Sequence, residues 1–212
     1  MSYYSYGGGL GGFGAFPPVI KNLLIINVLV FLGQILAERQ LMMWFALWPL
    51  ANGFQIHQLV SYSFLHGGFG HIFFNMFALW MFGMQIENTW GSRRFLIYYG
   101  ACVVGAGFVQ LATTYFSGGM WPTVGASGGV FGILLAFGML FPEQRIMLIF
   151  PPIPIKAKYF VIGYGVLELI YAGTGLQPGV AHLAHLGGMA AGFILIQYWR
   201  GQLPFKPNQA SY

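Results

Sequence analysis

Long apolar stretches almost free of charged residues dominate this sequence and leave it few ways to fold in water. Hydrophobic residues make up 57% of the 212 residues and charged residues only 6%, with a mean hydropathy of +0.68. A soluble domain carries about 25% charged residues. The sequence therefore predicts an integral membrane protein that exposes much of its surface to the lipid bilayer.

Six apolar segments, bounded by glycine, proline or charged residues, predict six helices. The fourth segment is short for a membrane span of about 20 residues. This favours a helix that begins inside the membrane below a re-entrant loop, buried in protein. We expect an all-α polytopic bundle of six transmembrane helices, near residues 19–37, 70–87, 94–116, 127–142, 157–173 and 182–199.

The domain organisation follows from these segments. One six-helix domain covers residues 19–199, after a flexible Gly- and Tyr-rich tail at 1–18 and before a short cytoplasmic tail at 200–212. The connection at about 38–68 holds an apolar, aromatic run at 41–49 that is too short to cross the membrane. We interpret this run as an interfacial hairpin.

The basic residues predict the orientation of the bundle. With the N-terminus inside, only Arg39 of the nine Lys and Arg residues falls outside, in agreement with the positive-inside rule. Both termini are then cytoplasmic. A bare six-helix core without a transit peptide favours a bacterial cytoplasmic membrane. The scattered positions of the basic residues exclude a phosphate-binding patch, so we expect no nucleic-acid partner.

A serine and a histidine lie in apolar segments, where burying a polar side chain has a high free-energy cost. Ser127 begins the fourth segment within Gly125-Ala126-Ser127-Gly128, and His185 lies inside the sixth. Ser127 alone is better explained as a helix N-cap, and His185 alone can be a polar contact between helices. However, small residues recur every four positions beside both of them, and such faces let helix backbones approach closely. These small residues are Gly128, Gly132 and Ala136, and Ala184, Gly188 and Gly192.

The second segment adds hydrogen-bond donors. His71 and Asn75 share one helix face at i,i+4 spacing. With the Ser127 N–H they can form an oxyanion hole, although packing hydrogen bonds explain Asn75 equally well. His66 precedes the helix, and we expect it to bond loop backbone and hold His71 in place. Glu87 should anchor the cytoplasmic end of this helix.

The sequence predicts neither a metal nor a cofactor. Four histidines could bind zinc in principle, but there is no HExxH motif, and the chain has no Asp. Its only carboxylates are Glu38, Glu87, Glu143 and Glu168, and no partner for Glu168 is evident. A serine–histidine dyad without a third, acidic member fits this composition.

Several motifs together resemble the signature of the rhomboid intramembrane serine proteases. They are the stretch from His66 to Asn75, the Gly125–Gly128 motif, and Ala184-His185-Leu186-Gly187-Gly188, in the same order along the second, fourth and sixth helices. Glu87, Gly91 and Phe95 resemble the family's ExxxGxxxF element. The resemblance covers about residues 19–199.

The resemblance implies Ser127 as nucleophile and His185 as general base, with His71, Asn75 and the Ser127 amide stabilising the oxyanion. Phe131 stands where many members have a tyrosine stacked on the catalytic imidazole, so we expect the stacking to persist. The implied substrates are transmembrane proteins in the lipid bilayer. Two alternatives remain: an inactive rhomboid-like protein that binds transmembrane helices, and a small transporter or channel, which the lack of an internal repeat disfavours.

Overall fold

The computed structural model describes residues 16–148, 151–176 and 179–204. Within these ranges the chain forms seven α-helices, two 3-10 helices (Leu50–Asn52 and Tyr62–Phe64) and one antiparallel pair of short strands. The strands are β1 (Arg145–Met147) and β2 (Pro154–Lys156). The helices are α1 (Pro18–Phe45), α2 (Gln58–Ser61), α3 (Phe69–Trp90), α4 (Ser92–Ser117), α5 (Ser127–Leu140), α6 (Ala157–Thr174) and α7 (His182–Trp199).

The six long helices correspond to the six predicted segments, and α1 carries a second helical piece beyond a break at Ala37. The first segment was predicted to end at residue 37, and α1 breaks at Ala37, whose φ of −142° and ψ of 44° are not helical, before a second helical piece runs on to Phe45. The apolar run at 41–49 is therefore largely the last part of α1. Its placement at the membrane interface stays a prediction, and the chain leaves the helix at Ala46, where the backbone is extended.

The strand pair β1–β2 between α5 and α6 was not predicted. Strands of three residues, one beginning with proline, carry too little alternation to be recognised in a sequence. At the base of the pair the exposed Glu143 forms ion pairs with Lys156 and Lys158. Hydrogen bonds from these two lysines lower the pKa of Glu143 to about 2. Most of the predicted N-terminal tail (1–15) and residues 205–212 lie outside the described residues.

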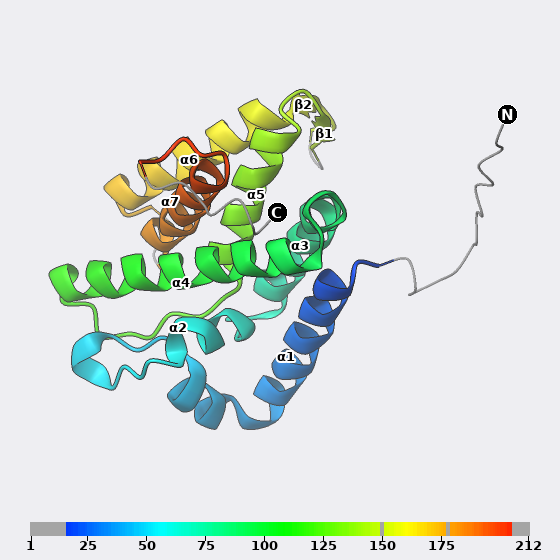
Figure 1. Cartoon of the computed structure of the whole chain (residues 1–212). Coiled ribbons are helices and arrows are strands. Elements are labelled where there is room, and N and C mark those ends of the chain that lie inside the picture. Colours follow the sequence, from blue (N-terminus) through cyan, green and yellow to red (C-terminus); the bar gives the residue numbers. More distant parts are fainter. Residues whose placement is uncertain (1–15, 149–150, 177–178, 205–212) are drawn as a thin grey trace, which may run out of the picture.

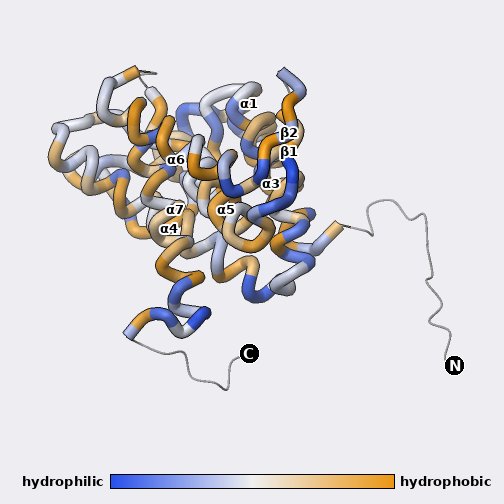
Figure 2. The backbone as a smooth tube through the Cα atoms, turned by 90° about the horizontal axis from the view of Figure 1, so that it is seen from above, coloured by the Kyte–Doolittle hydropathy of each residue, from blue (hydrophilic) through white to orange (hydrophobic). Residues whose placement is uncertain are grey.

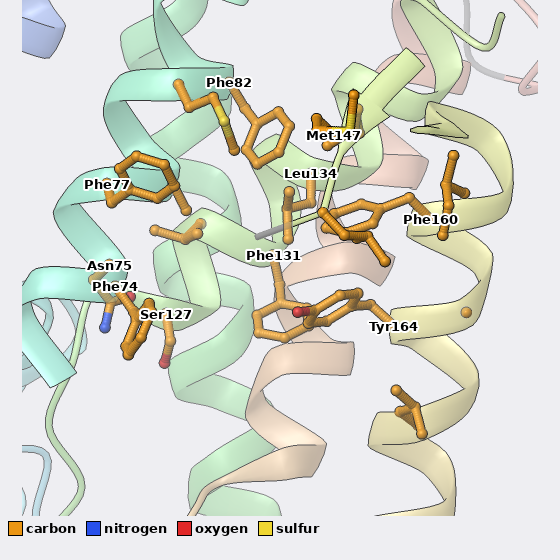
Figure 3. Close-up of a pocket in the computed structure, with 18 of the residues that line it drawn as sticks. Phe74, Asn75, Phe77, Phe82, Ser127, Phe131, Leu134, Met147, Phe160 and Tyr164 are labelled. Atoms are coloured by element: carbon orange, nitrogen blue, oxygen red, sulfur yellow. The ribbon is translucent and has the colours of Figure 1, made fainter. Parts of the chain in front are cut away.

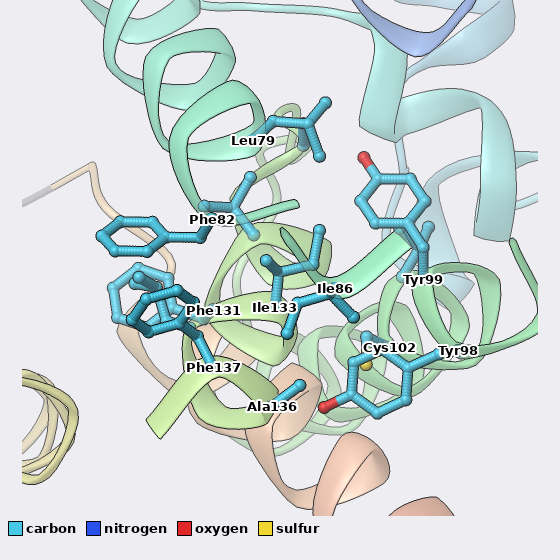
Figure 4. Close-up of a cluster of buried hydrophobic side chains, with 14 of the residues drawn as sticks. Leu79, Phe82, Ile86, Tyr98, Tyr99, Cys102, Phe131, Ile133, Ala136 and Phe137 are labelled. Atoms are coloured by element: carbon cyan, nitrogen blue, oxygen red, sulfur yellow. The ribbon is translucent and has the colours of Figure 1, made fainter. Parts of the chain in front are cut away.

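Helix α5 lies at the centre of the bundle and contacts α3, α4, α6 and α7 (Figure 1). Ten of its fourteen residues are buried, which explains why it is apolar on every side. Figure 4 shows its side chains Phe131, Ile133 and Phe137 meeting residues of α3 and α4, with Phe82 and Phe137 packed edge to face at 4.9 Å. The first residue of α5 is partly buried, and the buried part of the helix begins directly after it.

The outer surface of the bundle is apolar. Large hydrophobic side chains of α1, α4 and α6 point outward, and Leu36 is 89% exposed. Figure 2 shows hydrophobic residues along much of α4, α5 and α7. Among the described helices, α1, α3 and α4 are long and apolar enough to span a membrane. The chain is an all-α, multi-pass membrane protein, as the sequence predicted.

The predicted small-residue faces bring α5 and α7 into backbone contact. A Cβ placed on Gly188 would lie 1.9 Å from the Gly128 carbonyl oxygen, and one on Gly132 would lie 3.3 Å from the Gly188 oxygen. Gly128 also meets α4, where its Cβ would lie 2.3 Å from the Cβ of Ala106. The two faces therefore set the separation of the helices that carry Ser127 and His185.

Glu87 fixes the start of α1 against the end of α3. Its carboxyl oxygens accept hydrogen bonds from the backbone N–H groups of Val19 (2.9 Å) and Ile20 (2.8 Å). The Ser92 hydroxyl donates a third bond to Oε1 at 2.6 Å. The carboxyl thus satisfies N–H groups that lack partners in the first turn of a helix. This contact confirms the expectation that Glu87 anchors this end of its helix.

Candidate active site

Ser127 and His185 meet at the interface of α5 and α7. The Nε2 atom of His185 lies 2.8 Å from the Ser127 hydroxyl oxygen, and the imidazole is only 7% exposed. The two residues are 58 positions apart, and the close approach at Gly128 and Gly188 brings their helices together. A histidine nitrogen that accepts the hydroxyl hydrogen is the arrangement that activates serine as a nucleophile.

Ser127 is the first residue of α5 and not its N-cap. The N-cap position belongs to Ala126, and no side chain caps the helix. The hydroxyl of Ser127 is thus available to His185, while its backbone N–H belongs to a first turn that has no intrahelical acceptors. The N-cap interpretation of Ser127 is therefore wrong.

The segment before Ser127 is held from both sides. Leu47 and Thr123 exchange two backbone hydrogen bonds of 3.0 Å, and the Gly125 N–H donates to the Tyr62 carbonyl. Gly125 has a φ of +129°, and a Cβ on it would lie 2.7 Å from the His71 ring. Only glycine combines this backbone conformation with this close approach.

Phe131 stacks on the imidazole of His185. The ring centroids are 4.4 Å apart and the planes are inclined by 7°. Phe131 follows Ser127 by one helical turn, so the same helix supplies both the hydroxyl and the aromatic face that contact His185. The stacking restricts the plane of the ring, and Nε2 is the nitrogen that faces Ser127.

His71 and Asn75 of α3 line the same site. The Gly67 N–H donates to His71 Nδ1 at 3.2 Å, which leaves the hydrogen of a neutral imidazole on Nε2. That nitrogen faces Gly125, at the entrance to α5. The Asn75 amide donates one hydrogen bond of 2.8 Å to the His71 carbonyl and has a second N–H group. Both side chains can thus present donors toward Ser127.

His66 is held by a residue that the sequence did not reveal. Gln34 of α1 accepts a hydrogen bond from the His66 N–H at 2.9 Å and donates one to its carbonyl at 3.2 Å. The His66 ring packs edge to face on His71, with centroids 5.2 Å apart. We expected the imidazole to bond loop backbone, but the hydrogen bonds that hold His66 join its own backbone to a glutamine of another helix.

The environment of His66 predicts a pH-dependent stability. Burial, followed by the nearby His71, lowers the pKa of His66 from 6.5 to about 4. The unfolded chain therefore binds a proton between pH 6.5 and pH 4 that the folded chain does not, so acidification over this range destabilises the fold by roughly 3 kcal/mol. We expect the Tm in detergent to fall less steeply over this range in His66→Gln than in the wild type. Parallel curves would contradict this expectation.

A third polar residue from α6 reaches the pair. Glu168 Oε2 lies 3.0 Å from His185 Nδ1 and 2.7 Å from His182 Nδ1. No partner for Glu168 was evident from the sequence, and the predicted serine–histidine pair without a third, acidic member does not include this contact. Among the described residues, Glu168, His182 and His185 are also a group with metal-ligating atoms close together, within 4.8 Å of one another. The hydrogen bonds between the two Nδ1 atoms and Glu168 Oε2 explain why these three atoms lie close together without a metal.

Ser127 opens into a cavity between α3, α5 and α6. The cavity has a volume of about 780 Å³, and its lining includes residues of β1 and β2. Figure 3 shows Ser127 and Asn75 at one side, with Phe74 beside them and Phe131 and Tyr164 facing each other further along. Its lining is largely aromatic and aliphatic, with His71 and Asn75 on the α3 side and two tyrosines on α6. An extended apolar segment of another chain fits such a space.

The fold and the site define a helical, multi-pass membrane protein with a serine–histidine pair beside a row of hydrogen-bond donors. The family model of the rhomboid domain matches residues 53–201. The chain belongs to the rhomboid family, a family of intramembrane serine proteases.

Curated relatives of the chain come from mitochondria and from a bacterium. It is 29% identical over 196 residues to the mitochondrial presenilin-associated rhomboid-like protein of Homo sapiens, covering 87% of this chain and 50% of that protein. It is 33% identical to the mitochondrial rhomboid protein 1 of Saccharomyces cerevisiae (64% and 40% covered) and 32% identical to the rhomboid protease GluP of Bacillus subtilis (64% and 24%). The chain spans half or less of the length of these relatives.

Proposed function

We propose that the protein is an intramembrane serine endopeptidase that hydrolyses peptide bonds in or near the transmembrane segments of other proteins. The observation that carries the proposal is the 2.8 Å contact between His185 Nε2 and the Ser127 hydroxyl, at the edge of an apolar cavity. Family membership supports the same chemistry. The bilayer and single transmembrane helices are the partners that this reading requires.

In this mechanism Ser127 Oγ attacks the carbonyl carbon of the substrate while His185 Nε2 takes the hydroxyl proton. The negative charge that forms on the carbonyl oxygen accepts hydrogen bonds from the Ser127 N–H, His71 and Asn75. The C–N bond then breaks, and the imidazolium gives its proton to the leaving amine. Water attacks the resulting ester, His185 takes the proton of this water, and the proton returns to Ser127 as the new carboxyl group leaves.

The substrate segment has to unwind before its carbonyl can reach Ser127. A helix uses its carbonyl oxygens in internal hydrogen bonds, so weak helix formers such as glycine lower the free energy of unwinding. The cavity between α3 and α6 offers room for the unwound residues. We therefore propose α6, with the glycines that follow it, as the moving side of the site. The connection after α6 includes residues 177–178, which lie outside the described residues.

The distribution of charge supports one orientation. Lys21 belongs to the first turns of α1, and Glu87 ties this end of α1 to the end of α3 that precedes Arg93 and Arg94. We propose that this end, with both chain termini, faces the side where basic residues are retained, and that Ser127 opens toward the other side. A bacterial cytoplasmic membrane and a mitochondrial inner membrane both fit this proposal, since the relatives come from both sources.

A fluorophosphonate probe tests the proposed nucleophile directly. We expect the purified wild type to form an adduct that mass spectrometry locates on Ser127, and to cleave a single-span substrate in liposomes. Ser127→Ala is the matched control, because it removes one oxygen atom and leaves α5 intact. We expect it to show neither adduct nor cleavage.

The same assay distinguishes the alternatives. A wild-type protein that binds the substrate helix but neither reacts nor cleaves would favour a non-catalytic, helix-binding member of the family. Equal cleavage by wild type and Ser127→Ala would contradict the assignment of the nucleophile.

A further inference from the structure

The carboxyl group of Glu168 accepts bonds from two histidines with a single oxygen. His182 Nδ1 lies 2.7 Å from Oε2, and His185 Nδ1 lies 3.0 Å from the same atom. All three residues are buried, with 6–7% of their surface exposed. A carboxyl group this well enclosed, in an apolar helix, has a high desolvation cost that these two bonds offset.

The geometry fixes which nitrogen of His185 carries the hydrogen. A carboxylate can only accept hydrogen bonds, so each Nδ1 that faces Oε2 has to be an N–H donor. In a neutral imidazole the other nitrogen then has a free lone pair. For His185 this is Nε2, the atom 2.8 Å from the Ser127 hydroxyl. The Glu168 contact thus selects the tautomer that can accept the hydroxyl proton.

The same contact bears on the charge that forms during the reaction. When His185 takes a proton at Nε2, the ring becomes positively charged in surroundings that exclude water. A carboxylate on the opposite nitrogen stabilises this imidazolium more strongly than it would in water. His182 directs the carboxyl by donating to Oε2, so Glu168 keeps its position without a rearrangement.

We propose that Glu168 is a positioning residue that completes a Ser127–His185–Glu168 triad, and that His182 holds Glu168 in place. The inference rests on the proposed function and deepens it, because it concerns the same hydroxyl and the same imidazole. A purely structural role, in which the cluster only joins α6 to α7, makes different predictions for the rate and for the tautomer of His185.

Kinetics of Glu168→Gln separate these roles. This variant keeps the size and the hydrogen-bonding capacity of the side chain but removes its charge and allows an N–H to face Nδ1. We expect kcat to fall about 10²- to 10⁴-fold, because His185 adopts the wrong tautomer and its imidazolium loses a counter-charge, with KM within about twofold. Glu143→Gln, which changes an exposed carboxyl group, is the control with unchanged kcat. His182→Phe removes the bond that holds Glu168 in place but leaves the contact of Glu168 with His185. We therefore expect a smaller reduction of kcat, about tenfold.

Spectra of ¹⁵N-labelled histidine give a second readout that does not depend on turnover. In Ser127→Ala, which retains Glu168, we expect the hydrogen of His185 on Nδ1, and in Ser127→Ala/Glu168→Gln we expect it to move toward Nε2. This measurement decides the question even where Glu168→Gln alone folds poorly, since an Nε2–H tautomer in the Glu168-containing protein would overturn the proposal.

The kinetic outcomes are also distinct. A folded Glu168→Gln with kcat within twofold of the wild type overturns the triad and leaves the proposed protease function intact. A wild type that neither reacts with the phosphonate nor cleaves overturns the protease function, and the triad falls with it. A large loss of kcat at constant KM, with Ser127→Ala inactive, supports both.

Discussion

Replacing Gly188 by alanine is expected to force α5 and α7 apart and to eliminate cleavage. The new methyl group would lie 1.9 Å from the Gly128 carbonyl oxygen and 2.7 Å from its carbon, both of which are backbone atoms. Backbone atoms cannot change rotamer to avoid the methyl group as a flexible side chain can. The two helices therefore have to separate. We expect a loss of roughly 3 kcal/mol or more in stability, because overpacking of this kind exceeds the usual range.

The effect on activity follows from the position of His185 one turn before Gly188. A shift of α7 lengthens the 2.8 Å contact with Ser127, and misplacement by about 1 Å costs roughly 10²-fold in rate. Thermal unfolding in detergent and cleavage in liposomes measure the two effects. Gly100→Ala is the matched control, since a Cβ on this glycine of α4 meets nothing within 4 Å. Equal behaviour of the two variants would show that the α5–α7 contact does not limit the site.

Replacing Glu87 by alanine is expected to detach the start of α1 from α3. The buried carboxyl accepts from two backbone N–H groups and from the Ser92 hydroxyl, and alanine leaves all three donors without this acceptor. We expect a loss of about 4 kcal/mol, on the scale of two strong hydrogen bonds to a carboxyl group. Glu87→Gln should lie between wild type and Glu87→Ala, because the amide keeps one acceptor oxygen.

A melting curve of each variant tests this expectation, with Glu143→Ala as the control for loss of an exposed carboxyl group. The control should leave the Tm unchanged, since exposed ion pairs contribute little. Protease sensitivity at the start of α1 should increase in Glu87→Ala only. An unchanged Tm in Glu87→Ala would mean that water replaces the carboxyl at no cost.

Composition and periodicity predicted the class of the fold because these signals are local. A segment of about 20 apolar residues identifies a helix in a membrane whatever its neighbours are. The six predicted helices match within a few residues, and in α1 the predicted end at residue 37 coincides with the break at Ala37. Small residues at four-residue spacing also predicted the contact of α5 with α7, since only such faces allow backbone contact.

The polar contacts could be predicted only in part. Ser127 and His185 stood out because polar residues are rare in apolar segments. Glu168 was equally conspicuous, yet its partners depend on the rotation of α6 about its axis. A helix that is apolar on nearly every side gives no periodic signal for this rotation. Gln34 was not predicted as a partner because His66, which it contacts, lies 32 residues away on a loop.

The sequence by itself determined that the chain lies in a membrane, where its helices run, and which helices can touch. These properties depend on hydrophobicity and side-chain size, which each segment carries alone. Only the tertiary structure decided that His182 and His185 both contact one oxygen of Glu168. It also decided that Ser127 is the first residue of α5 and not its N-cap. Hydrogen bonds require distances near 3 Å between atoms of different helices, and such distances depend on how all the helices pack together.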